Sequence, residues 1–213
     1  MNKVAIIGAG GLGREVKYLI DDINAVSLNK IELIGYYDDA IPKGHFIVDN
    51  LPCLGKIEDL VDYTDDLGIV FGLGDTQIKK QILNLIEKNK SLNYPNIIHP
   101  NAHITKGVLF GKGNLIAYGC FISCDVEIGD FNFINTYCAV GHNTVIGNGN
   151  VFMPRVQISG DVIIGDENFW GMSASVLQGK KVGNENKING FTFLTKSISN
   201  RRTYFGVPGK KIN

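Results

Sequence analysis

Large apolar residues recur at every sixth position through the second half of the chain, from Ile98 to Leu194, without a break in phase. A period of six does not match the repeat of an α-helix. It fits a short strand, in which alternate residues point inward, followed by a tight corner. Three such units close a coil of about 18 residues, and stacked coils form a parallel β-helix. The pattern therefore predicts a β-helix of between five and six coils over residues 98–213.

Two other positions in each six-residue unit support this coil. Glycine often follows the apolar residue, as at Gly111, Gly129 and Gly141, where we expect it to permit the backbone angles of a sharp corner. The residue two places before the apolar one is mostly small or slim, which suits an inward slot. Because residues 18 apart should stack, we expect Cys120 and Cys138 to be reduced neighbours in the core.

The position just before each apolar residue should point outward, and yet ten of its sixteen occupants are apolar. They are Leu109, Leu115, Phe121, Phe133, Ala139, Val145, Val151, Ile163, Phe169 and Phe193. An exposed surface this apolar is typical of a contact between proteins. We therefore expect a homo-oligomer that packs side by side through the faces of the coil.

In residues 1–97, strand-like apolar runs alternate with helical periodicity, which is typical of a different fold. Apolar runs predict strands over residues 4–7, 31–37 and 69–73. Helical periodicity predicts one helix that runs through residue 20 and a second over residues 77–88, with Ile78, Ile82, Leu85 and Ile86 on its buried face. Strands that alternate with helices predict a small parallel α/β domain of the Rossmann type. We place the domain boundary between residues 97 and 98.

A glycine-rich segment, G-x-G-G-x-G at residues 8–13, joins the first strand to the first helix. Such a turn presents backbone N–H groups and a helix N-terminus to a phosphate. Asp38 and Asp39 follow the second strand and Gly74 follows the third, at the edge where parallel sheets bind ligands. We expect a nucleotide diphosphate here. The alternatives are a tight turn without a ligand and a nicotinamide dinucleotide with Asp38 on its ribose, which we disfavour because residues 1–97 leave no room for a hydride acceptor.

The composition of the 213 residues, 44% hydrophobic and 20% charged, is that of a globular protein. No run of 18 apolar residues could span a membrane, four cysteines are too few for a disulfide scaffold, and no secretion signal opens the chain. We therefore expect a cytoplasmic protein with free thiols. The 21 basic and 21 acidic residues balance, which disfavours a nucleic-acid-binding protein.

The charge is unevenly distributed along the chain. Residues 1–97 hold 10 basic and 14 acidic side chains (net −4), and residues 98–213 hold 11 and 7 (net +4). From Lys180 onward there are eight basic residues and one acid, Glu185. This cluster is either a solvated rim or a site for a small polyanion.

Of the four histidines, we assign structural roles to His45 and His103 and a connecting role to His99, which precedes a proline. His142 lies in a Gly-His-Asn corner on the outside of the coil, where it can meet a neighbouring subunit. An imidazole there can accept a proton from a nucleophile. Stacking by 18 puts Cys124 below His142 and Gly160 above it. It likewise puts Asp125 below Asn143 and Asp161 above it, so that either carboxylate can orient the imidazole or merely cap the corner backbone.

The order of these motifs resembles one family: the glycine-rich turn, Asp-Asp, Gly-Asp, an Ile-His-Pro junction, hexapeptide coils with Gly-His, and a final Gly-Val-Pro-Gly-Lys. This is the sialic acid O-acetyltransferase family, which includes N-acetyltransferases of nucleotide-linked 4-amino-4,6-dideoxy sugars. The resemblance implies a left-handed β-helix after a Rossmann-like domain, a homotrimer, and acetyl-CoA as donor.

Site residues follow from the resemblance by position. It implies that the nucleotide sugar contacts the N-terminal domain at Gly10, Leu12, Gly13, Arg14, Asp38, Asp39 and Gly74. It implies that His142 is the general base, with Asn143, Asp125 and Asp161 beside it. It places acetyl-CoA along the coils and the C-terminal segment, at Val151, Met172, Gly190, Lys196, Pro208 and Lys210.

Three positions depart from the family pattern. Asn143 stands where many members have an acid that raises the basicity of the histidine. Val151 stands where many have a second histidine near the acetyl group, and Leu12 stands where some have a histidine that faces phosphate. The first departure gives Asp125 and Asp161 more weight. The last leaves Arg14 and backbone amides to hold the diphosphate.

The expected activity is acetyl transfer from acetyl-CoA to the amine of a nucleotide-linked sugar used in surface glycans, such as an O-antigen or a glycoprotein. Backbone N–H groups of the coil would hold the thioester oxyanion, and the late basic residues would attract the phosphates of coenzyme A. No metal is required. The alternatives are O-acetylation of a sialic acid or another sugar hydroxyl, and a non-catalytic trimer that only binds nucleotides. The base of the nucleotide and the stereochemistry of the sugar are left open.

Overall fold

The computed structural model describes residues 2–212. The chain divides into two compact units, Met1–Pro100 and Asn101–Asn213. Within the described residues, no helix combines the length and the apolar character needed to cross a membrane.

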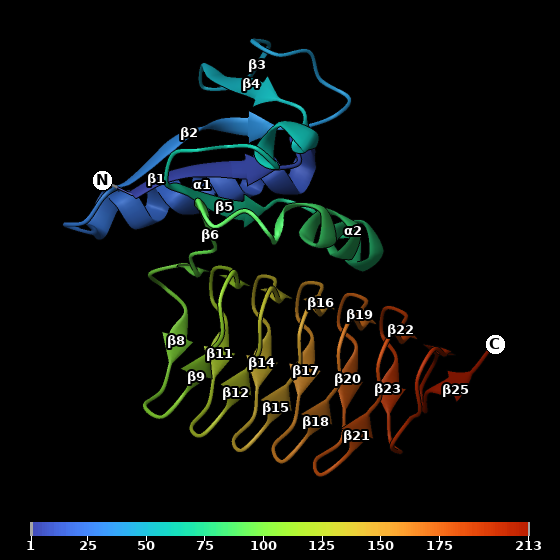
Figure 1. Cartoon of the computed structure of the whole chain (residues 1–213). Coiled ribbons are helices and arrows are strands. Elements are labelled where there is room, and N and C mark those ends of the chain that lie inside the picture. Colours follow the sequence, from blue (N-terminus) through green and yellow to red (C-terminus); the bar gives the residue numbers. More distant parts are fainter. Residues whose placement is uncertain (1, 213) are drawn as a thin grey trace. The chain divides into compact units, whose positions relative to one another are not determined.

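The first unit is a largely parallel sheet with two α-helices (Figure 1). The sheet has the strand order β3-β4-β2-β1-β5-β6, and only β3 runs antiparallel to its neighbour. In chain order the elements are β1 (Asn2–Ile7), α1 (Gly11–Val26), β2 (Ile31–Tyr37), β3 (Phe46–Val48), β4 (Leu51–Gly55), the 3₁₀ helix η1 (Ile57–Leu60), β5 (Leu67–Phe71), α2 (Thr76–Ile86), β6 (Leu92–Asn93) and β7 (Ile97–Ile98).

The centre of this sheet is its core. Residues 4–7 of β1 and all of β5 are buried, as expected for parallel strands covered on both faces. β1 pairs with β2 on one side and with β5 on the other. The loops after β1 and β5 therefore flank the point where the strand order reverses, which is where such sheets bind ligands.

The predicted elements of the first unit need three corrections. α1 continues to Val26 rather than residue 20, because no glycine or proline interrupts residues 20–26. β5 lies two residues earlier than predicted. On α2, Ile78 and Leu85 are about half exposed, at 48% and 47%, because the buried face is formed by Lys79, Ile82 and Ile86. The short strands β3, β4 and β6 carry no clear periodicity and were not predicted.

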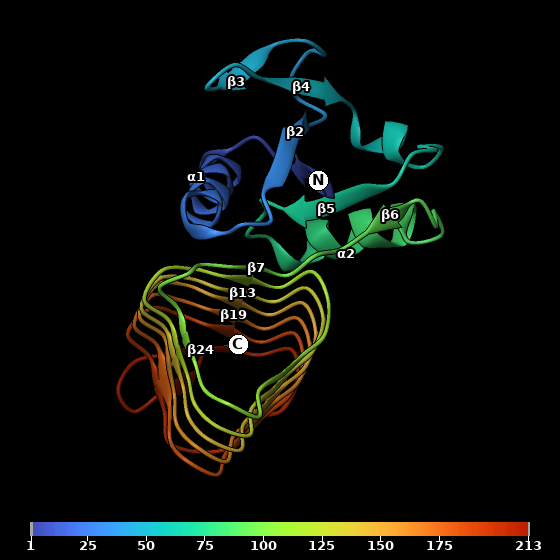
Figure 2. The ribbon, with the colours of Figure 1, turned by 90° about the vertical axis from the view of Figure 1, so that its left-hand side faces the viewer.

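The second unit winds as three-sided coils with a two-residue strand on each side (Figures 1 and 2). The first face holds β8 (His103–Ile104), β11 (Phe121–Ile122), β14 (Ala139–Val140), β17 (Gln157–Ile158), β20 (Ser175–Val176) and β23 (Phe193–Leu194). The second face holds β9 (Leu109–Phe110), β12 (Glu127–Ile128), β15 (Val145–Ile146), β18 (Ile163–Ile164) and β21 (Lys181–Val182).

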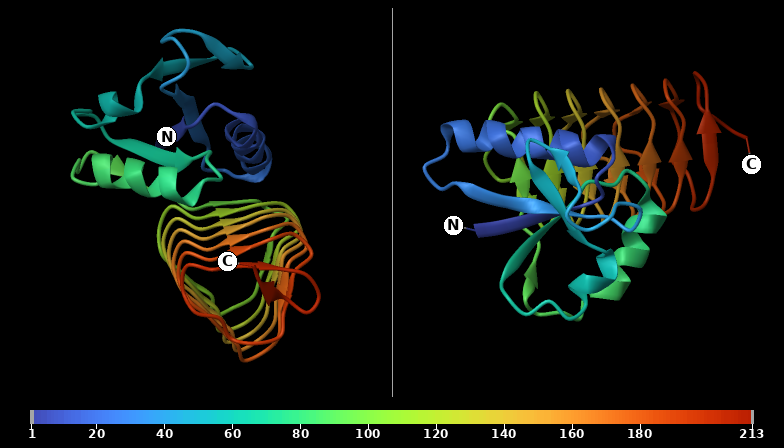
Figure 3. Two further views of the ribbon diagram at one scale, coloured as in Figure 1. Left: turned by 90° about the vertical axis from the view of Figure 1, so that its right-hand side faces the viewer. Right: turned by 90° about the horizontal axis from the view of Figure 1, so that it is seen from above.

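The third face holds β10 (Leu115–Ile116), β13 (Phe133–Ile134), β16 (Val151–Phe152), β19 (Phe169–Trp170) and β22 (Lys187–Ile188). It continues into β24 (Thr203–Phe205), which forms an antiparallel pair with β25 (Lys210–Lys211). The view along the stack shows the coils lying over one another in register (Figure 3). Strand partners are 18 residues apart, as in Ala139 with Gln157 and Val145 with Ile163, so the predicted stacking is confirmed.

The interior is filled by the six-residue series and by one polar ladder. The apolar series is buried from Ile116 to Leu194, and Cys120 and Cys138 are buried free thiols, as predicted. The ladder consists of five buried asparagines, 18 residues apart: Asn114, Asn132, Asn150, Asn168 and Asn186. Each side-chain amide nitrogen after the first donates to the side-chain oxygen of the asparagine below, at 3.0–3.1 Å. Buried amides are stable here because each has partners in the neighbouring coils.

The glycines that follow the apolar residues do not supply the corner angles, contrary to prediction. The left-handed backbone occurs two residues later, for example at Asn143 and Gly149 (φ 57° and 68°). The glycines are required by the close approach of the next coil. A Cβ at Gly147 would lie 2.4 Å from a carboxylate oxygen of Asp166, and one at Gly141 would lie 2.4 Å from the backbone nitrogen of Gly160.

The predicted exposure of the outward positions is correct for only part of them. Leu109, Phe121, Val145 and Ile163, on the first and second faces, are exposed. Leu115, Phe133 and Val151, on the third face, are buried within the single chain. The apolar surface open to a partner is therefore smaller than predicted and does not include these three side chains.

Candidate functional site

His142 lies in the corner that joins the first face to the second, which we call the His142 corner (turn residues 105–108, 123–126, 141–144, 159–162 and 177–180). Its side chain is exposed, and within residues 2–212 the imidazole makes no hydrogen bond. The ring rests against the next coil, since a Cβ on Gly160 would lie 2.7 Å from both its Cε1 and its Nε2 atoms. The predicted stacking of Gly160 on His142 is therefore present.

Asp161 is the carboxylate beside this ring. Its Oδ1 accepts a hydrogen bond from the Asn143 side-chain amide at 3.0 Å, and its Oδ2 accepts one from the Gln178 side-chain amide at 2.7 Å. These two bonds, with a smaller contribution from the charge of His142, lower the pKa of Asp161. The carboxylate is therefore ionised at neutral pH, and it can stabilise a positive charge on the imidazole.

The other predicted neighbours of His142 have different surroundings. The carboxylate of Asp125 lies toward the coil below, where a Cβ on Gly107 would approach its Oδ1 to 2.9 Å. The structure therefore does not bring Asp125 to the imidazole, and Asn143 acts as the donor that fixes Asp161. Asp125, Asn143 and Asp161 all adopt the left-handed conformation (φ 57–58°), which Asp and Asn tolerate better than most residues.

A backbone donor lies beside the ring. Gly160 is buried, and within the described chain its N–H has no hydrogen-bond acceptor. Buried N–H groups without a partner are uncommon because the lost hydration is not replaced. The His142 corner thus offers a proton acceptor, a carboxylate and an unpaired N–H donor within two successive turns.

The glycine-rich turn forms the second candidate region, in the first unit. Gly8 takes a left-handed conformation (φ 95°), and a Cβ on Gly13 would lie 1.9 Å from the Gly8 carbonyl oxygen, so both glycines are needed for the turn. Gly10 and Gly74 have open space where a Cβ would be. No side chain caps the N-terminus of α1. Its free N–H groups are therefore available to an anion.

The side chains expected near this turn divide into two groups. Asp38 accepts the Ala9 N–H at 2.8 Å with one oxygen and the Ala40 N–H at 2.9 Å with the other, so it fixes the glycine-rich turn. Asp39 accepts the Ile57 N–H at 2.9 Å. Arg14 is exposed and, among residues 2–212, makes no ion pair, while Leu12 is half-buried. The predicted residues are thus gathered at one edge of the sheet.

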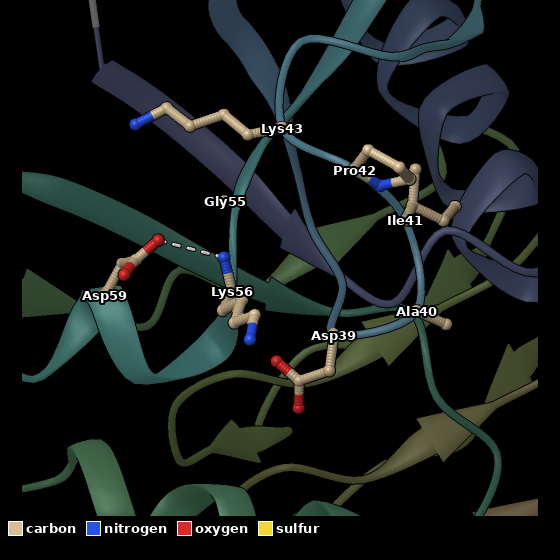
Figure 4. A pocket seen from close by; sticks show the side chains of 8 residues that line it. All are labelled: Asp39, Ala40, Ile41, Pro42, Lys43, Gly55, Lys56 and Asp59. Carbon is tan, nitrogen blue, oxygen red and sulfur yellow. Dashed lines mark hydrogen bonds between the residues drawn. The ribbon is translucent and has the colours of Figure 1, made fainter.

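A hollow of about 460 Å³ lies beside Asp39, between the segments that follow β2 and β4 (Figure 4). Ile41 and Pro42 form its apolar side, and Lys43, Lys56 and Asp59 add charge. The Lys43 and Lys56 ammonium groups have no partner within the described residues. Sequence reasoning missed these lysines, because nothing in their spacing links them to the glycine-rich turn; only the parallel pairing of β2 with β4 does.

The residues expected to contact acetyl-CoA are spread over the corners, the third face and the C-terminal strand pair of the second unit. Met172 is exposed, and Gly190 lies in the coil above it, where a Cβ would approach the Met172 carbonyl oxygen to 3.2 Å. Lys196, Pro208 and Lys210 are exposed, and neither lysine side chain has a partner among residues 2–212. Val151 is fully buried, which argues against the contact expected for it.

The remaining histidines and cysteines have structural surroundings. Nε2 of the buried His99 lies 3.0 Å from a carboxylate oxygen of Asp22, and the His103 ring stacks on Phe121. Burial raises the pKa of the Cys120 and Cys138 thiols to about 11 and about 12, so both stay protonated. Among the described residues, no group of three or more His, Cys, Asp or Glu side chains is placed to hold a metal ion.

Comparison with known proteins supports the fold of the chain. Residues 3–86 match the PglD N-terminal domain family. An uncharacterized protein of Acanthamoeba polyphaga mimivirus is 30% identical over 131 residues, which is 62% of this chain and 24% of that protein. The chain therefore spans about a quarter of the length of this curated relative.

Three solved structures resemble the whole chain. The acetyltransferase domain of PglB from Neisseria gonorrhoeae, in complex with acetyl coenzyme A, is 24% identical, with 100% of both chains covered and a TM-score of 0.87. A mutant of perosamine N-acetyltransferase from Caulobacter crescentus, in complex with CoA and GDP-perosamine, is 21% identical, with 100% of this chain and 98% of that one covered and a TM-score of 0.87.

WeeI from Acinetobacter baumannii is 22% identical, with 100% of both chains covered and a TM-score of 0.87. Because all three structures are less than 25% identical to this chain, the similarity establishes the fold alone. The predicted fold is confirmed: a parallel α/β unit is followed by a left-handed β-helix, as in these structures.

Proposed function

We propose that this protein transfers the acetyl group of acetyl-CoA to the amine of a nucleotide-linked 4-amino-4,6-dideoxy sugar. The observation that carries the proposal is the His142 corner, where a free imidazole, the carboxylate of Asp161 and the unpaired N–H of Gly160 lie together. The similar structures support the substrate class, since they hold acetyl-CoA in one case and CoA with GDP-perosamine in another.

In the proposed reaction, the amine nitrogen of the sugar attacks the carbonyl carbon of the thioester. His142 takes the proton that the nitrogen loses, directly or through water, and Asp161 stabilises the imidazolium. The Gly160 N–H donates to the carbonyl oxygen as negative charge develops on it. The carbon–sulfur bond then breaks, and the coenzyme A thiolate takes the proton from His142. The products are an N-acetyl sugar and free coenzyme A.

The two units have separate binding roles in this proposal. The N–H groups at the start of α1 and the free Arg14 guanidinium hold the diphosphate, and Asp38 and Asp39 fix the loops around the nucleotide. Lys196 and Lys210 attract the phosphates of coenzyme A, with Met172, Gly190 and Pro208 along the rest of the donor. Because His142 is exposed and the first and second faces carry apolar side chains, a neighbouring subunit of a homotrimer would complete the site.

The test is release of free thiol from acetyl-CoA in the presence of nucleotide-linked 4-amino sugars, with the product identified by mass spectrometry. We expect an N-acetylated product from wild type. Replacing His142 by Ala should lower kcat by about 10²–10⁴-fold, the range for a lost general base, and leave the Kd of both substrates nearly unchanged. A near-normal kcat in that variant would remove His142 from the mechanism. Acetylation of a hydroxyl sugar alone, or binding without turnover, would replace the proposed reaction.

A further inference from the structure

Gly160 differs from other corner glycines of the β-helix in the atoms that occupy the space where a side chain would begin. Glycines such as Gly149 adopt a left-handed backbone (φ 68°), and those such as Gly147 meet the neighbouring coil. The backbone of Gly160 lies outside the left-handed region. The three atoms nearest to a Cβ built on it are Cε1, Nε2 and Cδ2 of His142, at 2.7, 2.7 and 3.1 Å.

The same column of the corner accepts larger side chains in other coils. Lys106, Cys124 and Gln178 occupy the second position of the turn above and below His142 and Gly160. The fold therefore does not demand glycine at this position. The atoms that an alanine would meet are those of the imidazole, and because real Cβ atoms are essentially never found within 3.0 Å of another heavy atom, the alanine would displace the ring.

We propose that Gly160 is a positioning residue for His142: its missing side chain leaves the space in which the imidazole lies against the next coil. The backbone supports this arrangement, because the Asp161 N–H donates to the His142 carbonyl at 2.8 Å and the Gly179 N–H donates to the Gly160 carbonyl at 3.0 Å. The ring is thereby kept beside the Gly160 N–H and next to the residue that bears the carboxylate of the corner.

The catalytic consequence rests on the proposed function, in which the base and the N–H donor act on one thioester. A methyl group at residue 160 would move the ring while leaving the N–H and the coil in place. Displacing a catalytic group by about 1 Å costs about 100-fold in rate, which is the loss that we expect in kcat for Gly160→Ala. Since the His142 side chain is exposed and can rotate, we expect Tm to stay close to wild type.

The experiment compares wild type, Gly160→Ala, His142→Ala and the double variant, each by Tm, by kcat for thiol release and by crystal structure. The proposal expects a displaced imidazole in Gly160→Ala. It also expects that Gly160→Ala lowers the residual kcat no further once His142 is alanine. An unmoved ring with unchanged kcat would overturn it, and so would an equal loss in both backgrounds.

Two other outcomes are equally decisive. If Gly160→Ala fails to fold but the double variant folds, the clash is with the imidazole and the proposal stands; if neither folds, the space serves the coil and the proposal falls. If wild type transfers no acetyl group, the proposed function fails, and the position of the ring in the two crystal structures still decides the role of Gly160.

Discussion

The β-helix uses the same four-residue turn in two corners with different results. In the corner that joins the second face to the third, which we call the ladder corner, the second turn position is Asp130, Asn148, Asp166 or Asn184. Each of these side chains accepts the backbone N–H of the coil below at 2.6–2.9 Å. In the His142 corner the same position holds Cys124, His142, Gly160 and Gln178, and none of these side chains makes that bond within residues 2–212.

The difference shows what repetition does in this fold. Where an oxygen recurs every 18 residues, the corner N–H groups are paired and the coils are fixed to one another. Where the recurrence breaks, the imidazole of His142 and the N–H groups of the second turn positions, that of Gly160 among them, are left without partners within residues 2–212. Unpaired groups cost stability, and folds keep them mainly where they serve a function. The ladder corner is therefore expected to govern stability, and the His142 corner activity.

The largest effect on stability is expected in the buried asparagine ladder, which occupies the fourth turn position of the ladder corner. Asn150 donates to the Asn132 side-chain oxygen at 3.1 Å and to the Gly165 carbonyl at 2.9 Å, and its own oxygen accepts from the N–H and the side-chain amide of Asn168. Asn150→Leu leaves these groups unpaired and should destabilise the protein by about 3 kcal/mol, which thermal unfolding would register as a Tm lower by several degrees.

The matched control for Asn150→Leu is Thr144→Val, at the fourth turn position of the His142 corner. The Thr144 hydroxyl donates to the Ser159 carbonyl at 3.1 Å and accepts the Val162 N–H at a longer 3.4 Å. We expect this variant to cost about 1 kcal/mol. Equal Tm losses at the two positions would contradict the contrast between the corners.

The next largest effect is expected in the first unit, at Asp38. Since both carboxylate oxygens hold backbone N–H groups, Asp38→Ala should loosen the glycine-rich turn. KM for the nucleotide sugar should rise about tenfold, a loss of about 1.4 kcal/mol of binding, while KM for acetyl-CoA stays constant. Asp38→Asn keeps one acceptor and should show a smaller rise. An effect confined to acetyl-CoA would refute the assignment of the nucleotide to this unit.

The smallest expected effect is at Gln178, whose replacement tests the contribution of Asp161 to the His142 corner. Gln178 lies in the coil above, and its side-chain amide donates to Oδ2 of Asp161 at 2.7 Å. Gln178→Leu frees one carboxylate oxygen, and because the pair is exposed the loss in kcat should be only about threefold. Gln157→Leu, on the first face and without contact to Asp161, is the control. A steady-state comparison in which both variants lose activity equally would rule out a specific role for Gln178.

Much of this architecture was predictable, because the 18-residue register converts sequence spacing directly into contacts. That register places Gly160 on His142 and Asp161 above Asn143, and the structure shows both. The asparagine ladder was not predicted, although Asn114, Asn132, Asn150, Asn168 and Asn186 recur at the same spacing. A buried amide is stable only with hydrogen-bond partners, and here those partners come from the neighbouring coils.

Other features depend on details that spacing does not carry. Gln178 lies 17 rather than 18 residues from Asp161, so its contact depends on side-chain direction. The glycines after the apolar residues were assigned to the corner angle, but they are required by the distance between coils. The hollow beside Asp39 depends on β4, whose short strand has no distinct pattern.

The central claim is that the activity depends on the particular residues of the His142 corner and not on the four-residue turn that both corners share. The most direct measurement is thiol release from acetyl-CoA, in the presence of a nucleotide-linked 4-amino sugar, for His142→Asn beside Asn148→Ser at the same turn position in the ladder corner. The account predicts that His142→Asn loses most turnover at an unchanged Tm, whereas Asn148→Ser keeps its turnover at a lowered Tm. Full turnover in His142→Asn would contradict it.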